Sequence, residues 1–589
     1  MAVTRCFVPY PFEPQRHAAR LPPRRDGIET QRHPVVVVGA GPVGYTAALG
    51  LARHGVPVVL IEADDGVCTG SRAICISRRS LEIMDRLGAL PGFIQHGLPW
   101  TGGRSFYRDT EVLRFAMPTD ANQRLPPMLN LAQYRIEQIL LDAAQAQPEL
   151  IDIRWQTKLV GIETQDDGVR LQLSTPAGDY ALNADWLIAA DGGRSTVREA
   201  MGLAMRGATY EGRYVIVDIL LDSDRATERL AYFDPPCNPG STVLVHKQPD
   251  NVWRIDYQLR DGEDPAEAIQ PENVVPRVES LLAMMGETGA WSPIWITIYK
   301  AHALTLDRYR HGRVLLAGDA AHLLPIFGVR GANSGIDDAD NLAWKLAAVI
   351  QGQAHGAAAD ALIESYSTER VAAAHENLAH GRKSTEFMAP PSFAFDLMRR
   401  AVLGLAAEHP GVRPLINPRQ TSAIAYTDSM LNGPDVGGFS AGPAPGAVLP
   451  QCVVHSLPVA ADAPVADPPS AADPPSLADP PLASGYVTDS LGCGLTALWF
   501  TADGHAAAAA LLRAVHVCAA LGVALSLHRL PLQANPQATQ LFGAAPGALY
   551  LVRPDGHVLA RWRGLPAPAL AAALLGEARR LYGAEETTA

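Results

Sequence analysis

Three glycines with GxGxxG spacing, Gly39, Gly41 and Gly44, follow the apolar run 35–38 and precede a helical stretch. A second apolar run ends at Glu62. This order predicts a strand, a tight turn at Gly39, and a helix whose N-terminus binds a pyrophosphate brought close by Gly41. Gly44 lets helix and strand touch, and Glu62 is placed to bind a ribose. The full context favours a dinucleotide site over a ligand-free glycine turn, without saying which dinucleotide.

A second buried strand pattern, within "DWLIAADGGRSTVRE" (185–199), ends at Asp191 and is followed by Arg194. A carboxylate and arginines at a strand end suit ribose or phosphate groups, although an ordinary turn with surface arginines fits the segment equally well. Thr196 and Glu199 have capping-box spacing, which predicts a helix start there. Further along, "GDAAHLLPIFGVRGANSG" (318–335) packs four glycines between an apolar strand and a helix expected from about Ser334.

These three segments, in this order, resemble the fingerprints of the single-component FAD-dependent aromatic hydroxylases, the class A flavoprotein monooxygenases. The 3-(3-hydroxyphenyl)propionate hydroxylase and phenol hydroxylase-like members are the nearest in pattern, over residues 33–380. The resemblance implies that Arg72, Gln133 and Asp319 contact FAD, with Asp319 at the ribityl chain. It also assigns cofactor-binding roles to Gly331 and Asn333, and places Pro325 beside the reactive edge of the flavin ring.

The third segment departs from the commoner family pattern, because Ile326 replaces a proline and Arg330 stands where glutamine is usual. Arg330 could bind a substrate carboxylate or the charge of reduced flavin, or point to solvent. His322 is a candidate catalytic group, and a packed, hydrogen-bonded histidine is the alternative. We therefore name Pro325, Arg330 and His322 as candidate catalytic residues.

The resemblance implies that NADPH or NADH reduces FAD, that O2 gives a C4a-hydroperoxyflavin, and that a phenolic ring is hydroxylated. A hydroxyphenyl-alkanoic acid or a related phenol is the expected small aromatic substrate. The single GxGxxG strand context agrees with a nicotinamide that has no domain of its own. The alternatives are another FAD-dependent reaction, such as dehydrogenation, epoxidation or natural-product tailoring, and a non-catalytic FAD-binding protein. The WxWxIP signature of halogenase-like members is absent, and "SPIWITIY" is the nearest sequence.

The substrate is expected to lie between the flavin and a β-sheet formed by residues 206–302. In "VWRIDYQL" (252–259), large apolar residues alternate with polar ones, and "TVLVHKQ" predicts a neighbouring strand. The apolar face could cover a planar ring or pack on helices. Tyr257 and His246 are the candidates for substrate contact.

The predicted fold class is α/β, with a Rossmann-like FAD-binding domain of glutathione reductase type, an inserted substrate sheet and a C-terminal thioredoxin-like domain. The predicted FAD-binding domain is discontinuous, over 33–205 and 303–410, and 206–302 form the substrate domain. Residues 1–32 are an N-terminal extension, and 411–485 are an irregular region with a proline-rich linker repeated from Ala466. Residues 486–589 resemble the thioredoxin-like domain of phenol hydroxylase-type members without a CxxC pair, so we expect a structural or homodimer-forming role.

The composition of the chain limits the classes of binding partner that we expect. The chain has 589 residues, 48% hydrophobic and 19% charged, and a net charge of -12. Without a basic stripe, nucleic acid is not an expected partner. The seven cysteines have neither CxxC nor zinc-type spacing, so no metal site is expected. Arg513 and His516 interrupt the most apolar helical stretch, and no apolar export segment follows Arg24-Arg25. We therefore expect a cytoplasmic protein without a membrane span.

Overall fold

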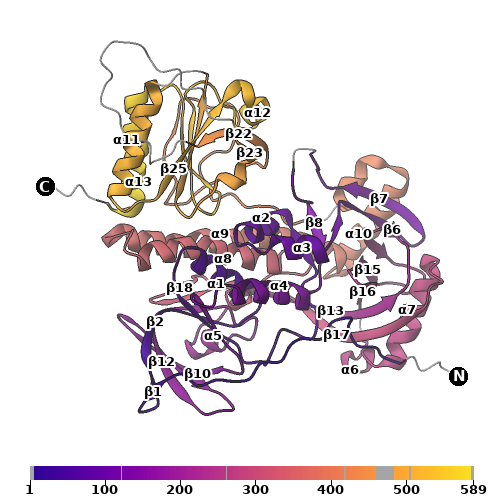
Figure 1. Ribbon diagram of the computed structural model, residues 1–589. Helices are drawn as coiled ribbons and strands as arrows, with labels where there is room; N and C mark the ends of the chain where they lie inside the picture. The colour runs from indigo at the N-terminus through magenta and orange to yellow at the C-terminus, as the bar shows by residue number, and fades with distance from the viewer. Residues whose placement is uncertain are drawn as a thin grey trace, which may run out of the picture. The chain divides into compact units, whose positions relative to one another are not determined.

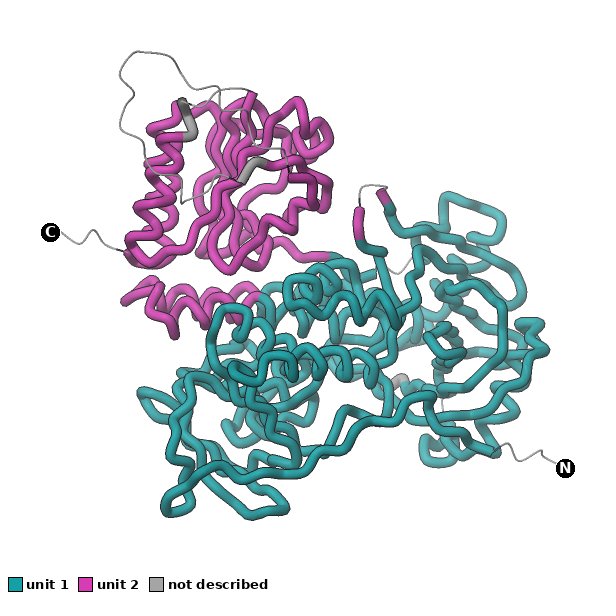
Figure 2. The backbone as a smooth tube through the Cα atoms, viewed as in Figure 1, with its two compact units in different colours: residues 1–119, 125–340, 370–422 teal, residues 120–124, 341–369, 423–589 magenta. Residues whose placement is uncertain are grey.

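The structure is a computed structural model that describes residues 6–584 apart from 121–122, 261, 417–419, 459–482 and 503–505. The chain forms two compact units, coloured separately in Figure 2. Unit 1 comprises residues 1–119, 125–340 and 370–422, and unit 2 comprises residues 120–124, 341–369 and 423–589. The proline-rich repeat predicted from Ala466 falls outside the described residues.

A nine-stranded sheet carries the dinucleotide motif in unit 1. Its main path is β10 (Lys158–Gln165), β11 (Gly168–Ser174), β12 (Tyr180–Ala189), β2 (Ile28–Val38), β3 (Val58–Ile61) and β9 (Ile151–Arg154), with β1 (Arg24–Arg25), β18 (Arg310–His311) and β19 (Val314–Leu316) attached. Strands β19, β12, β2, β3 and β9 are parallel. The valines of residues 35–38 are buried, as expected for a parallel strand covered on both faces.

Helices follow these strands in the predicted order (Figure 1). The described helices of the parallel-sheet region are α1 (Pro42–Arg53), α4 (Gln133–Gln145) and α5 (Thr196–Ala200). The N-terminal extension, residues 1–32, contains β1 and the first residues of β2, which begins at Ile28. Main-chain pairing of Ile28 with Ala181 in β12 extends the strand beyond its apolar stretch.

An eight-stranded sheet forms the other half of unit 1. Its order is β20 (His322–Leu323), β17 (Trp291–Thr305), β13 (Arg206–Leu221), β16 (Val252–Gln258), β15 (Thr242–Lys247), β14 (Arg229–Phe233), β6 (Gly102–Tyr107) and β7 (Thr110–Ala116). The predicted pairing of the 242–247 and 252–258 strands is confirmed as antiparallel. Helix α7 (Pro271–Met285), after the short α6 (Pro265–Ala268), packs its apolar residues on one face of this sheet (Figure 1).

Smaller elements complete unit 1. A three-stranded sheet has the order β4 (Cys75–Ser77), β8 (Met128–Asn130) and β5 (Leu98–Trp100). The helices α2 (Arg78–Arg86) and α3 (Leu90–His96) lie between β4 and β5 in the chain. Three longer helices follow β20, namely α8 (Gly331–Ile350), α9 (Gly356–Met388) and α10 (Phe393–Glu408). Helix α8 begins at Gly331 instead of about Ser334, because the Ser334 amide already donates to the Arg330 carbonyl at 2.8 Å.

Unit 2 contains a seven-stranded mixed sheet. Its order is β21 (Asp435–Val436), β27 (Val558–Trp562), β26 (Leu549–Val552), β24 (Leu495–Thr501), β25 (Leu525–Pro531), β22 (Val453–Pro458) and β23 (Ala483–Tyr486). Its helices include α11 (Ala506–Ala520), α12 (Pro536–Leu541) and α13 (Ala567–Tyr582). The core of the unit combines residues of these strands and helices with Trp344 and Leu362.

No helix in the described part of the chain is long and apolar enough to cross a lipid bilayer.

Candidate active site

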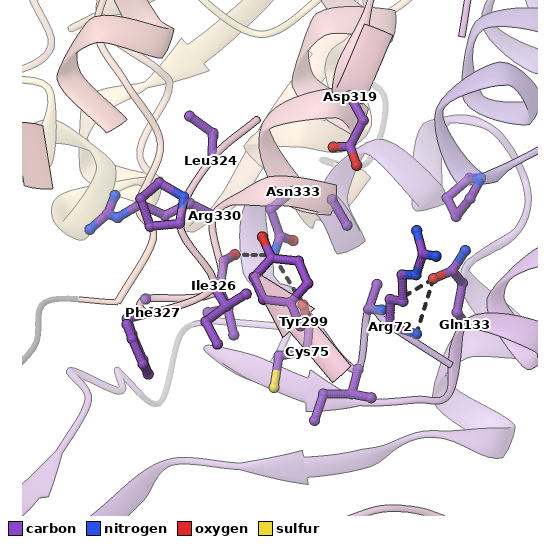
Figure 3. Close-up of a pocket in the computed structure, with 18 of the residues that line it drawn as sticks. Arg72, Cys75, Gln133, Tyr299, Asp319, Leu324, Ile326, Phe327, Arg330 and Asn333 are labelled. Atoms are coloured by element: carbon purple, nitrogen blue, oxygen red, sulfur yellow. Dashed lines mark hydrogen bonds between the residues drawn. The ribbon is translucent and has the colours of Figure 1, made fainter. Parts of the chain in front are cut away.

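One cavity of about 370 Å³ in unit 1 brings the sequence motifs together. It is bordered by the glycine loop at Gly41, by Arg72 and Gln133, by Asp319, and by the segment from Leu324 to Asn333. The eight-stranded sheet supplies the remaining wall. Figure 3 shows Arg72 and Gln133 together on one side of the cavity and Ile326, Phe327 and Arg330 on the other, with Tyr299 between them.

The glycine loop has the geometry that its spacing predicts. Gly39 has a φ of 99°, which disfavours any residue with a Cβ. A Cβ on Gly44 would lie 1.8 Å from the Gly39 carbonyl oxygen, so only glycine lets α1 pack against this turn. A Cβ on Gly41 would meet nothing within 4 Å. Gly41 thus borders open space at the N-terminus of α1, as a pyrophosphate of FAD requires.

Glu62 and Asp191 stand at the carboxyl ends of β3 and β12. Glu62 accepts hydrogen bonds from the amides of Ala40 at 2.7 Å and Asp64 at 2.9 Å, so the loop holds its carboxylate in place. Asp191 accepts from the Val197 amide at 3.1 Å, and its other oxygen is buried without a partner among the described residues. That oxygen fits a hydroxyl donor such as a ribose. The Arg194 side chain is exposed and lies outside the cavity lining.

The segment containing Arg72 is fixed by Gln133. The side-chain oxygen of Gln133 accepts hydrogen bonds from the amides of Arg72 at 3.3 Å and Ala73 at 3.2 Å (Figure 3). Its amide nitrogen donates to Glu137 at 2.9 Å. Gln133 therefore shapes the loop at the cavity, and the guanidinium of Arg72 stays exposed and able to reach an anionic cofactor.

Asp319 and Pro325 both border the cavity, as the family resemblance implies. Desolvation by the surrounding protein raises the pKa of Asp319 and the nearby His322 and Arg72 oppose this rise, although the side chain itself remains exposed. Its carboxylate has no hydrogen-bond partner among the described residues and can accept from hydroxyl groups of a ribityl chain. Pro325 packs against Gly381, where a Cβ would approach the proline ring to 3.2 Å. The proline is therefore held rigidly at the cavity wall.

The side chain of His322 does not border the cavity, as a catalytic residue would. Its side chain is fully buried, lies outside the cavity lining, and has Nε2 2.7 Å from Asp338. Asp338 also accepts from the Gly318 amide and from Arg370. Burial raises the pKa of Asp338, but Arg370 and His322 together lower it to about 2. The packed, hydrogen-bonded alternative therefore describes His322, which supports the loop that presents Asp319.

We expect His322→Gln to lower the thermal unfolding midpoint by several degrees, because it weakens a buried hydrogen bond to a charged group worth about 1.5–3 kcal/mol. The pH profile of turnover should keep its shape, since the ring is away from the cavity. Thermal unfolding and a rate profile from acid to alkaline pH test this. Loss of one ionisation from the variant's profile would restore a catalytic role.

Arg330 does not point to solvent. Its side chain is 3% exposed, borders the cavity, and donates to the side-chain oxygen of Asn377 at 2.9 Å. Asn333 links α8 to β4 and α2, donating to the carbonyls of Cys75 and Val329 and accepting from Ser77 and Ser80 (Figure 3). Gly331, at the N-terminus of α8, also lines the cavity. This end of the cavity therefore combines a buried cation with free amides of a helix N-terminus.

One face of the eight-stranded sheet packs on α7, and the other face borders the cavity. Trp253, Ile255 and Tyr257 belong to the core formed with α7, and Tyr257 lies outside the cavity lining. The apolar alternation was correctly identified, but it faces the helix, so Tyr257 packs in the core. The opposite face borders the cavity with His246, as predicted, and with residues that the sequence analysis did not select, among them Arg229, Arg254 and Asp256.

A hydrogen-bonded chain connects the N-terminal extension to this wall. The Tyr10 hydroxyl donates to Asp218 at 2.6 Å, and Asp218 accepts twice from Arg254 at 2.8 Å. Arg254 in turn donates to the carbonyls of Ser71 and Arg72. The extension, to which the sequence analysis assigned no chemistry, therefore reaches the loop that presents Arg72.

We expect Tyr10→Phe to weaken FAD binding severalfold, because loss of the partly buried hydrogen bond to Asp218 loosens the Arg72 loop. Tyr134→Phe is the matched control: Tyr134 packs beside Tyr10 at 5.0 Å, and its hydroxyl has no hydrogen-bond partner among the described residues. FAD fluorescence on dilution measures the affinity. Equal FAD affinities in the two variants would contradict the proposed connection.

Comparison with known proteins agrees with this site. The FAD binding domain family matches residues 32–380. The chain is 32% identical over 336 residues to the 3-(3-hydroxy-phenyl)propionate/3-hydroxycinnamic acid hydroxylase of Mycolicibacterium smegmatis, covering 57% of this chain and 58% of that protein. It is 32% identical over 378 residues to the 6-methylpretetramide 4-monooxygenase of Streptomyces rimosus, covering 63% and 64%. The chain thus matches about three fifths of the length of these curated relatives.

A solved structure shares the fold over most of the chain. The flavin-dependent monooxygenase PieE, in complex with FAD and substrate, superposes with a TM-score of 0.76 at 21% identity. The match covers 94% of this chain and 100% of that one. The similarity extends beyond residues 32–380 and includes both units.

Proposed function

This chain belongs to the FAD binding domain family, and from that premise we propose that it is an FAD-dependent monooxygenase that hydroxylates a phenolic ring with NAD(P)H and O2. One observation carries the proposal: a single cavity is bordered both by the dinucleotide loop at Gly41 and by the polar face of the eight-stranded sheet at His246 and Asp256. A cofactor and a second molecule can therefore meet in one cavity. The two relatives, a 3-(3-hydroxy-phenyl)propionate/3-hydroxycinnamic acid hydroxylase and a 6-methylpretetramide 4-monooxygenase, support this reaction class.

The residues present fit FAD. Gly41 leaves room for a pyrophosphate, and Asp319 borders the cavity and suits the ribityl hydroxyls. Glu62 and Asp191 lie outside the cavity lining, at the carboxyl ends of their strands, and suit a ribose. When bound, the flavin would supply redox chemistry, accepting a hydride from the nicotinamide and using dioxygen as the oxygen source. The chain would position the ring of the substrate, exclude water by the apolar wall of Ile326 and Phe327, and stabilise negative charge with Arg330 and the N-terminus of α8.

We further propose that the C-terminal unit has a structural role. The order β24–β25 parallel and β24–β26–β27 antiparallel, with α11 and α13, supports a thioredoxin-like arrangement. Cys493 is exposed and Cys518 is buried, and no disulfide joins the cysteines among the described residues. The sequence of this unit also lacks the CxxC spacing that dithiol redox domains use.

The test is oxidation of NADPH and NADH by the FAD-loaded protein in air, with a panel of phenols, hydroxyphenyl-alkanoic acids and fused-ring phenols. The expected result is that at least one compound accelerates oxidation and is recovered with one additional hydroxyl group. Peroxide is quantified in parallel to separate hydroxylation from uncoupled oxidation. A flavin that NAD(P)H reduces without any hydroxylated product would favour another oxidoreductase reaction, and a flavin that is never reduced would favour a non-catalytic role.

A further inference from the structure

Three adjacent strands place a polar cluster on the cavity side of the eight-stranded sheet. Arg229 lies on β14, His246 on β15 and Asp256 on β16, and these strands are consecutive in the sheet. Leu230, Val245 and Ile255 are each adjacent in sequence to one of these polar residues. They face the opposite side of the sheet and belong to the core formed with α7. The three polar side chains thus share the face that borders the cavity.

Two of these side chains have no hydrogen-bond or ion-pair partner among the described residues. Arg229 is 5% exposed and Asp256 is 8% exposed, yet neither makes a side-chain hydrogen bond among the described residues. Arg254, next to Asp256 on the same face, differs because its guanidinium is occupied by Asp218 and by two carbonyls. Buried charged groups are normally paired, so an unpaired arginine and carboxylate that border a cavity indicate a ligand that pairs them.

The surroundings shift the pKa values of His246 and Asp256 in opposite directions. Burial lowers the pKa of His246 to about 3, helped by Arg229 and Arg254, so the ring is neutral and cannot carry a proton near neutral pH. Burial raises the pKa of Asp256 to about 7, with Arg254 lowering it, Asp218 raising it and Arg229 lowering it. The titratable and charged groups acting on Asp256 are Arg254, Asp218 and Arg229, with Cys75 and His246 also at this end of the cavity. Asp256 can therefore exchange a proton at physiological pH.

We propose that Asp256 and Arg229 together bind a free ring hydroxyl of the aromatic substrate, Asp256 taking its proton and Arg229 stabilising the phenolate. This inference rests on the proposed function and narrows its substrate to rings with an unblocked hydroxyl. The substrate O–H bond breaks, an O–H bond forms on Asp256, and the electron pair stays on the substrate oxygen. Net charge is conserved, because the negative charge moves from Asp256 to the phenolate beside Arg229. The neutral His246 supplies a hydrogen bond to the same group.

The test uses the oxidised FAD holoenzyme and 4-nitrophenol, whose ionised form absorbs visible light, so no turnover is needed. At about pH 8, where Asp256 and the free probe are both largely ionised, binding to the wild type should take up one proton. Asp256→Asn should bind the ionised probe without proton uptake. Arg229→Met should weaken binding of the ionised probe roughly thirtyfold, and Arg229→Lys should recover part of the loss. Asp224→Asn, at an exposed carboxylate, is the control.

Proton uptake on binding and the affinity for the ionised probe are the two quantities that test the roles of Asp256 and Arg229. Proton uptake in the wild type and the Asp224 control, lost in Asp256→Asn, supports it. Absence of uptake in the wild type, or equal uptake in Asp256→Asn, overturns it, and so does unchanged binding by Arg229→Met. FAD content and circular dichroism establish that each variant is folded, and Arg229→Lys serves if Arg229→Met is not. If these binding results hold but no phenol is hydroxylated, the proposed function fails while the binding role stands.

Discussion

Replacing Gly44 by alanine is expected to destabilise unit 1 by more than about 4 kcal/mol and to abolish FAD retention. The added Cβ would lie 1.8 Å from the Gly39 carbonyl oxygen and 3.0 Å from its carbonyl carbon. Both atoms are backbone, so no side-chain rotation can relieve the overlap. The helix α1 must move away from β2, and the buried surface between them is lost.

Gly41→Ala provides the matched comparison. Its Cβ meets nothing within 4 Å, and its φ of -78° suits alanine, so the protein should fold normally. FAD affinity should nevertheless fall roughly a hundredfold, because the methyl group occupies the space that a pyrophosphate needs at the helix N-terminus. Thermal unfolding and FAD content, measured on both variants, separate the two effects. Wild-type stability of Gly44→Ala, or wild-type FAD affinity of Gly41→Ala, would contradict the assignment of the loop.

Glu369→Ala is expected to lower the stability of unit 2 by about 3–5 kcal/mol, or roughly 10 °C in its unfolding midpoint. The Glu369 carboxylate accepts from Arg553 at 2.7 and 3.0 Å and from Lys345 at 2.7 Å. All three side chains are at most 1% exposed. Removing the carboxylate leaves two buried cations without the partner that they share, while Asp555 keeps its ion pair with Arg553.

The pH dependence gives a second readout of the same network. Burial would raise the pKa of Glu369, but Arg553 and Lys345 hold it well below its usual range. A depressed carboxyl pKa adds stability that is complete above the unfolded value and is lost as the pH falls through the folded value. Acidification below about pH 4 should therefore cost the wild type more stability than Glu369→Ala.

Glu376→Ala is the control for this experiment. Glu376 lies on the same helix, α9, but its side chain is 53% exposed and forms a 4.0 Å ion pair with His380. Its replacement should change the unfolding midpoint little, because exposed ion pairs contribute at most about 1 kcal/mol. Thermal unfolding at several pH values tests both variants. Equal losses in the two would show that the buried network does not stabilise the unit.

Much of the fold could be predicted from short sequence motifs. The strand, turn and helix around Gly39, Gly41 and Gly44 follow from backbone sterics, which act over a few residues and are therefore readable from spacing. The segment from Asp319 to Asn333 was placed at the same cavity through its family resemblance. The pairing of β15 with β16 was expected because the strand pattern "TVLVHKQ" precedes the alternating segment 252–259.

The residues that the sequence analysis misjudged depend on distant contacts. Alternation in β16 showed that two faces exist, but only the packing of α7 decides that Tyr257 faces the core and Asp256 the cavity. His322 was ambiguous because its partner, Asp338, lies on the next helix, and Arg370 on the one after. Charged residues such as Arg254 and Asp256, alternating with apolar ones inside a strand, were the available signal for a polar site.

The most direct test of the central claim is hydroxylation of a phenol under isotopically labelled dioxygen, with the FAD-loaded protein and NADPH in unlabelled water. The product analysed by mass spectrometry should carry one labelled oxygen atom in its new hydroxyl group, because a monooxygenase transfers one atom of O2 and releases the other as water. A new hydroxyl group without the label, or oxidation of the phenol without oxygen insertion, would contradict monooxygenation and point to another flavin-dependent reaction.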